Sequence, residues 1–375
     1  MEHTVAQTMD VVAGHVPPGL VNAGAWRAAR EVAARLPAAC ARGFYLECRL
    51  SEASSAVDWI VRVDETGRDA LAGRGPGAGL VAELRADPAW ERITRFCAEW
   101  ADEPQLRRAV THLWLEFDLD GGAPAVPRPS VFAAFDPQST ADLAPDEWAA
   151  LLDRVLRHLG PEAMSPATRR ALHAAVARRP AGAQVPYVGS MLARPVQPVR
   201  LYLAWVPARL LPGALHGMGW PGDPGELAAL LERVDGPAPG VAPDTGMAHV
   251  DVETEVLPRV GVELTFRRVE QLHGTLVETP FLERLVDLGL CTDAKRRGLL
   301  AWPGHELRTL PHELWPSVVA RRVNCVKLLH QPGEPPQAKG YLLTRWAPAS
   351  RRARGAAEAE GVAGIPTDAS PGSTA

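Results

Sequence analysis

The feature that most constrains the fold of this chain is a helix followed by two strands of alternating polarity, a unit that recurs about five times. The connection within each strand pair is short, which favours antiparallel hairpins. The units share almost no sequence, and only GWPGD at 219–223 and AWPGH at 301–305 are alike. Because such a unit buries its apolar face against its neighbours, the pattern predicts one α/β domain of five repeated α-β-β-α units with about ten strands.

The expected elements follow from hydrophobic periodicity and from helix start and stop residues, such as Ser165-Pro166. We expect strands at 43–50, 57–64, 110–119, 130–136, 184–192, 199–206, 249–253, 260–266, 323–330 and 338–345. We expect helices at 25–36, 88–102, 146–159, 166–178, 224–234, 281–289 and 292–302. A single domain at 21–347 then lies between a flexible N-terminus at 1–20 and a disordered tail at 348–375, which is rich in Ala, Gly, Ser and Pro.

The two sides of the expected strands differ sharply in polarity. In the first strand Phe44, Leu46 and Cys48 share one side, while Tyr45 and Glu47 share the other. Most other strands repeat this division, with Glu, Arg, Lys, Tyr, His and Trp opposite the apolar side. Two arrangements satisfy it. An open sheet would show the polar side to water, whereas a closed antiparallel barrel surrounded by helices would enclose it in a lumen wide enough for a ligand. We favour the barrel, because closure removes the exposed edges.

Composition excludes several classes of protein. A net charge of −4 gives no footprint for nucleic acid. No stretch is apolar enough for a membrane span, and the N-terminus lacks the features of a signal peptide. Five scattered cysteines, with no CxxC, indicate reduced thiols in a cytoplasmic protein. The sequence contains no phosphate loop, no GxSxG, no HExxH and no DDxxD-like cluster, so we expect no metal held by the protein itself.

The polar side of the strands supplies the groups that ionisation of a diphosphate needs. Fixed cations stabilise the anion that develops, aromatic faces stabilise a carbocation, and a carboxylate accepts the proton. The register of RVNCVKLLH at 322–330 leaves the face of Lys327 open.

Four features, at six positions, resemble a known family. Glu47 stands on the first strand and Arg62 on the second, and Arg200-x-Tyr202 and Lys339-x-Tyr341 are similar to Lys-x-Tyr pairs on even-numbered strands. With the five units, they resemble the ABBA, or PT-barrel, aromatic and peptide prenyltransferases over roughly residues 25–346. Two positions depart from that pattern. The fourth strand, SVFAAFD, has no Lys, and the eighth has Glu263 in place of Tyr.

The resemblance implies transfer of a prenyl group, dimethylallyl or geranyl, from its diphosphate to an aromatic small molecule or a peptide side chain. The expected diphosphate ligands are Arg49, Arg62, Arg200, Tyr202, Lys327, Lys339 and Tyr341. The expected cation shield and acceptor pocket comprise Tyr45, Trp114, Tyr202, Tyr341 and Glu263. The expected catalytic carboxylates are Glu47, as first choice for the base, and Glu116. No cofactor is required, although Mg²⁺ can accompany the diphosphate.

Two other functions stay open at this stage. One is a non-catalytic barrel that binds a peptide or an apolar ligand in a biosynthetic pathway. The other is an enzyme on the same barrel with different phosphorylated chemistry. The lumen discriminates between them, because a prenyltransferase needs several cations and aromatic rings at one level of the barrel.

Overall fold

The structure, a computed structural model, describes residues 3–52, 56–75, 79–161, 164–194, 196–235, 245–266, 279–311 and 313–349. Its strands are β1 (Gly43–Arg49), β2 (Val57–Val63), β3 (Val110–Phe117), β4 (Ser130–Phe135), β5 (Tyr187–Met191), β6 (Val199–Pro207), β7 (Thr245–Val252), β8 (Val256–Thr265), β9 (Gly304–Thr309), β10 (Pro316–His330) and β11 (Gln337–Pro348). Its longer helices are α2 (Ala23–Ala33), α5 (Pro88–Asp102), α8 (Pro145–Leu159), α9 (Pro166–Ala177), α11 (Pro224–Asp235), α13 (Thr279–Asp287) and α14 (Asp293–Ala301). The shorter ones are α1 (Val5–Asp10), α3 (Glu65–Leu71), α4 (Ala82–Arg85), α6 (Pro104–Ala109), α7 (Pro137–Thr140) and α10 (Leu211–Gly217).

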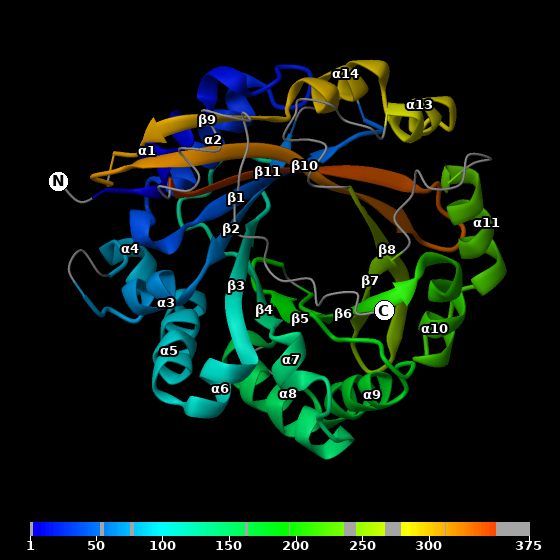
Figure 1. Ribbon diagram of the computed structural model, residues 1–375. Helices are drawn as coiled ribbons and strands as arrows, with labels where there is room; N and C mark the ends of the chain where they lie inside the picture. The colour runs from blue at the N-terminus through cyan, green and yellow to red at the C-terminus, as the bar shows by residue number, and fades with distance from the viewer. Residues whose placement is uncertain are drawn as a thin grey trace.

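Ten of the described strands form a closed antiparallel ring. Neighbours run in chain order from β1 to β8, after which β8 pairs with β10, β10 with β11, and β11 with β1. Figure 1 looks into this ring and shows the helices outside it. The predicted closed barrel is therefore confirmed, and the open sheet is wrong.

Strand β9 lies outside the ring. It pairs with the first half of β10, from Thr309 opposite Pro316 to Gly304 opposite Arg321, while the second half of β10 pairs with β8. The sequence prediction missed β9 and the start of β10. The segment GHELRT is mostly exposed, so it lacks the apolar alternation that identified the other strands.

The apolar side of the strands is the core, and it lies under the helices as expected. Buried tryptophans connect the two layers. On α5, the indole N–H of Trp90 donates to the carbonyl of Pro127 (2.7 Å), and that of Trp100 donates to the carbonyl of Val110 at the start of β3 (3.0 Å). Each bond satisfies the polar atom of a fully buried ring, so it fixes the helix against the barrel at no desolvation cost.

The chain start differs from the flexible segment expected at 1–20. Helix α1 packs into the core, where its residues Val5 and Met9 are fully buried, as is Val12 in the turn that follows, and the N–H of Val5 donates to the carbonyl of Leu36 (3.0 Å). The i, i+4 spacing of Val5 and Met9 places both on one helix face, but so short a helix gives little periodicity to detect. The expected tail at 348–375 lies outside the described residues from position 350 onward.

Helix starts agree well with the sequence. Ser165 Oγ accepts the N–H of Thr168 (3.0 Å), with Pro166 as the first helical residue. Among the described helices, none combines the length and the apolar character that crossing a membrane requires.

One glycine on the ring is predicted to be irreplaceable. A Cβ on Gly189 of β5 would lie 1.9 Å from the carbonyl oxygen of Val131 on the neighbouring strand, and backbone cannot move aside cheaply. We expect Gly189→Ala to lower the free energy of unfolding by about 1–3 kcal/mol in urea titrations. Gly213→Ala, where a Cβ meets nothing within 4 Å, is the control and should cost nothing. Equal effects of the two substitutions would contradict the strand packing described here.

Candidate active site in the barrel lumen

The inner side of the ring carries the polar residues that alternation placed on one face. On β1, Glu47 lies opposite Tyr341 of β11 on one side and opposite Asp58 of β2 on the other. Lys327 of β10 and Lys339 of β11 lie directly opposite each other. Lys327, whose face the sequence left open, therefore points inward.

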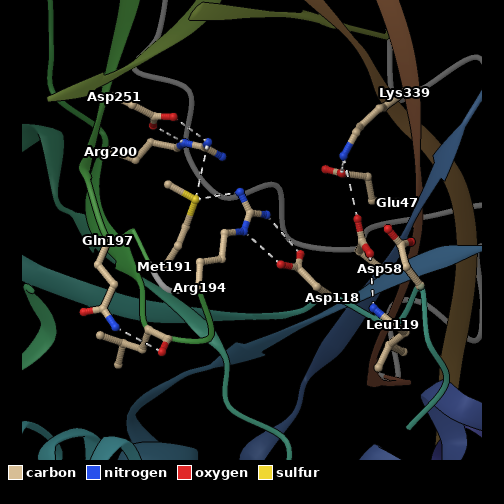
Figure 2. A network of polar contacts seen from close by, with 12 residues as sticks. Glu47, Asp58, Asp118, Leu119, Met191, Arg194, Gln197, Arg200, Asp251 and Lys339 are labelled. Carbon is tan, nitrogen blue, oxygen red and sulfur yellow. Dashed lines mark hydrogen bonds and ion pairs between the residues drawn. The ribbon is translucent and has the colours of Figure 1, made fainter. Parts of the chain in front are cut away.

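Glu47 is the centre of a buried ion-pair network (Figure 2). It is 1% exposed, it accepts a hydrogen bond from Lys339 Nζ, and its second oxygen lies 3.1 Å from Lys327 Nζ. Lys339 Nζ also lies 3.7 Å from the Asp58 carboxylate. Burial alone would raise the pKa of Glu47, but the two lysines outweigh burial and hold its pKa well below the usual range. Glu47 is therefore an ionised partner of two lysines at neutral pH.

A second network joins two arginines to two aspartates. Arg200 of β6 forms a two-pronged ion pair with Asp251 of β7, at 2.7 and 3.0 Å, and Arg194 forms another with Asp118, at 2.9 and 3.1 Å. Figure 2 shows the sulfur of Met191 between the two guanidinium groups. Paired forks of this kind fix both the position and the orientation of the arginines.

The cations of this charged layer are all matched by carboxylates. Besides the pairs above, Arg49 is ion-paired with Asp120, at a more exposed level. Within the described part of the chain, each of Arg49, Arg194, Arg200, Lys327 and Lys339 thus contacts an acid. An anionic ligand has to displace a carboxylate to reach any of them.

An aromatic cavity adjoins the charged layer. Its volume is about 90 Å³. Given the space that one water molecule needs, this is room for roughly six waters or more. Its lining residues are Tyr45, Ile60, Trp114, Glu116, Phe132, Tyr187, Tyr202, Met247, Glu263, Asn324, Cys325 and Tyr341. This set contains two acids and no base, so the cavity differs in character from the charged layer beside it.

The rings of the cavity form edge-to-face pairs. The Tyr45 ring centroid lies 5.2 Å from that of Trp114 and 6.3 Å from that of Tyr341, and Tyr202 lies 5.3 Å from Tyr187. Such contacts hold the rings in place and leave aromatic surface facing the cavity. Tyr341 belongs to both layers, because Lys327 Nζ lies 4.8 Å from its ring centroid.

Two carboxylates line this cavity without a countercharge. Glu116 of β3 and Glu263 of β8 are each 7% exposed, and neither has a cation within ion-pair distance among the described residues. Burial raises the pKa of Glu263 to about 7, with Glu47 and Glu116 adding to the shift and Lys327 opposing it. Burial and the Glu47 charge likewise raise the pKa of Glu116.

Three carboxylates in the lumen lie close enough for a metal ion. One oxygen from each of Glu47, Asp58 and Glu116 falls within 4.8 Å of the others. However, Lys339 already bridges Glu47 and Asp58. Burial, and to a smaller extent the charge of Glu47, raises the pKa of Asp58 to about 8. The arrangement therefore fits a lysine-bridged network better than a divalent-ion site, and we assign no metal to it.

The structure brings most of the candidate residues together. Tyr45, Trp114, Glu116, Tyr202, Glu263 and Tyr341 line one cavity, and Glu47, Arg200, Lys327 and Lys339 form the layer beside it. Arg62 is an exception. It lies opposite Trp114 on β3, two residues further along β2 than Ile60, and this position is away from the charged layer. Sequence reasoning missed the acids that pair with the cations. Asp58 and Asp251 alternate onto the inner face and were detectable in that way, whereas Arg194 follows β5 in a connection that gave no signal.

Comparison with known proteins gives structural likeness only. No protein-family model matches the chain, and no curated protein matches it. A 5-dimethylallyltryptophan synthase from Streptomyces coelicolor is 15% identical, with 90% of this chain and 94% of that one covered and a TM-score of 0.46. Prenyltransferase PriB, in a ternary complex with L-tryptophan and dimethylallyl thiolodiphosphate, is 16% identical, with coverage of 91% and 96% and a TM-score of 0.48. A 6-dimethylallyltryptophan synthase from Micromonospora olivasterospora is 14% identical, with coverage of 88% and 96% and a TM-score of 0.46.

The raised pKa of Glu263 predicts a pH-dependent cost of folding. The folded state binds this proton more tightly than the unfolded state, so the stability it contributes is present below pH 4.5 and is lost as the pH rises through about 7. Glu263→Gln keeps the neutral form at every pH. We expect the variant to be more stable than the wild type by about 1–3 kcal/mol at pH 8 and nearly equal to it at pH 4.5. Urea unfolding at both pH values checks this, and a difference that does not change with pH would contradict it.

Proposed function

We propose that the protein transfers a prenyl group from a prenyl diphosphate to an aromatic acceptor inside the barrel. The observation that carries this proposal is the contact between the two layers of the lumen. The ammonium of Lys327, which belongs to the charged layer, contacts the ring of Tyr341, and the same ring lines the aromatic cavity. This is the arrangement that separating a diphosphate anion from an allylic cation requires.

The reaction begins with cleavage of the allylic C–O bond, whose electron pair leaves with the diphosphate. Lys327, Lys339 and Arg200 are the cations that would receive the diphosphate, in exchange for their present carboxylate partners. The allylic cation then lies against the rings of the cavity. A ring carbon of the acceptor forms the new C–C bond and afterwards loses its proton.

The proton acceptor is better assigned to the cavity than to Glu47. Two lysines hold Glu47 in its ionised form with a low pKa, so it is a weak base, and it does not line the cavity. Glu116 and Glu263 do line it, and their raised pKa values bring them closer to the pH at which a general base works best. Glu47 then serves to position the two lysines.

The size of the cavity favours a free aromatic molecule over a peptide side chain as acceptor. A volume of about 90 Å³ has room for one ring and a short chain, and its walls are mostly buried side chains. The same volume favours dimethylallyl over geranyl as the transferred group.

One observation favours a second candidate, a barrel that binds a ligand without catalysis. Every described cation of the charged layer is already paired with a carboxylate. If those pairs do not exchange, the lumen holds no diphosphate, and the aromatic cavity serves binding alone.

Calorimetry with dimethylallyl diphosphate distinguishes the two candidates, because Glu47 competes with the diphosphate for the same ammonium groups. We expect Lys327→Ala to weaken diphosphate binding at least tenfold and Glu47→Gln to strengthen it. Mass spectrometry of reactions with a panel of small aromatic acceptors then detects transfer. Wild type that binds the diphosphate and alkylates an acceptor establishes the proposed function.

The control removes an exposed, carboxylate-paired cation from outside the barrel. Arg30 on α2 pairs with Asp10 at the surface, so Arg30→Ala should leave diphosphate binding unchanged. Circular dichroism verifies that each variant is folded, because breaking a buried ion pair is costly. Absence of diphosphate binding in folded wild type and in folded Glu47→Gln would overturn the proposal in favour of the binding barrel.

A further inference from the structure

Glu116 and Glu263 stand apart from the other carboxylates of the lumen. Glu47, Asp118 and Asp251 each form ion pairs with a lysine or an arginine. Glu116 and Glu263 have the same depth of burial as Asp251, yet no described cation lies within ion-pair distance of either. Lys327, the cation that acts most strongly on both acids, is held by Glu47.

An unpaired carboxylate in such a place is expensive. A buried charge persists only when it is paired, when it binds a ligand of opposite charge, or when it takes up a proton. Glu263 accepts a hydrogen bond from the thiol of Cys325 (3.9 Å), which carries no charge. The barrel pairs its other inner acids with cations at short distances, so the lack of a described cationic partner at two acids that face one cavity is a property of that cavity. A positively charged ligand supplies the missing countercharge.

The walls of the cavity suit the same kind of ligand. Tyr45, Trp114, Tyr202 and Tyr341 present aromatic rings, and the described residues that line the space include no lysine, arginine or histidine. A cation over an aromatic face is attracted by the ring quadrupole, most strongly where water is excluded. The lumen already contains one such contact, between the Lys327 ammonium and the Tyr341 ring (4.8 Å).

We infer that the cavity binds an aromatic amine in its protonated form, with the ammonium group against one of the two carboxylates, Glu116 or Glu263, and the ring among the aromatic side chains. If the protein is a prenyltransferase, this amine is the acceptor of the prenyl group, and that part of the inference rests on the proposed function. The binding of the amine itself does not depend on it. The carboxylate that does not contact the ammonium remains to accept the proton. An amino acid fits less well, because its own carboxylate meets two acids and no base.

Three ligands that share a phenyl ring and differ in the polar groups of a short side chain test the inference by calorimetry with no diphosphate present, at pH 8. They are 2-phenylethylamine, the neutral 2-phenylethanol and phenylalanine. We expect wild type to bind the amine at least tenfold more tightly than the alcohol, and phenylalanine more weakly than the amine. In the double variant Glu116→Gln/Glu263→Gln the amine should lose this preference, while the affinity for the alcohol changes less than threefold.

The control Glu91→Gln removes an exposed acid from α5 and should reproduce wild type. Thermal unfolding verifies the fold of the double variant, which buries less charge than wild type. Equal affinity for amine and alcohol, a preference that survives in the double variant, or no binding of the amine at millimolar concentration would each overturn the inference. If the proposed transferase function is wrong, the diphosphate calorimetry described above shows no binding. The amine assay contains no diphosphate, so its result is independent of that outcome.

Discussion

The hydrogen bonds between β11 and β1 join the last strand of the chain to the first, and every property of the site depends on them. The pairing runs from Gly43 opposite Arg345 to Arg49 opposite Lys339. In an open sheet, the inner residues would face water, where an ion pair contributes at most about 1 kcal/mol. Closure removes that water, so that the same charges interact strongly and an unmatched charge becomes costly.

The lumen meets this constraint differently in its two layers. In the charged layer, acids and bases neutralise one another in place, and Glu47 alone serves two lysines. In the aromatic cavity, Glu116 and Glu263 remain unmatched among rings that cannot neutralise them. The first layer is therefore close to electrostatic balance, and the second is poised for a ligand. An enzyme that separates a diphosphate from a cation makes use of both.

Strand alternation made the barrel and the inner face predictable. Phe44 and Leu46 lie outward and Glu47 inward, as the period of two requires, and the same rule placed Trp114, Tyr202 and Tyr341 correctly. Closure also followed, because the polar side repeated on almost every strand.

Contacts across the ring were not predictable from the sequence. Glu47 meets Lys327 and Lys339 nearly 300 positions later, and only the registers of several strand pairs together decide that contact. For this reason the sequence could nominate Glu47 as a base and the two lysines as diphosphate ligands, but it could not show that these lysines contact Glu47 and weaken it as a base. Strand β9 and helix α1 were missed for different reasons, since β9 is mostly exposed and lacks apolar alternation, whereas α1 is too short to show a clear period.

The Glu47 network also bears on how the chain finds its fold. Lys327 and Lys339 are direct neighbours on β10 and β11, and like charges in such positions normally oppose strand pairing. Glu47 offsets the repulsion between the two lysines because it pairs with both, but it can do so only in one register of the strands. A slip of β11 by one residue would turn Lys339 toward the helices, into the hydrophobic core and away from Glu47. The network therefore acts as a check on the alignment of the last strand, so that a barrel closed in the wrong register is rejected during folding.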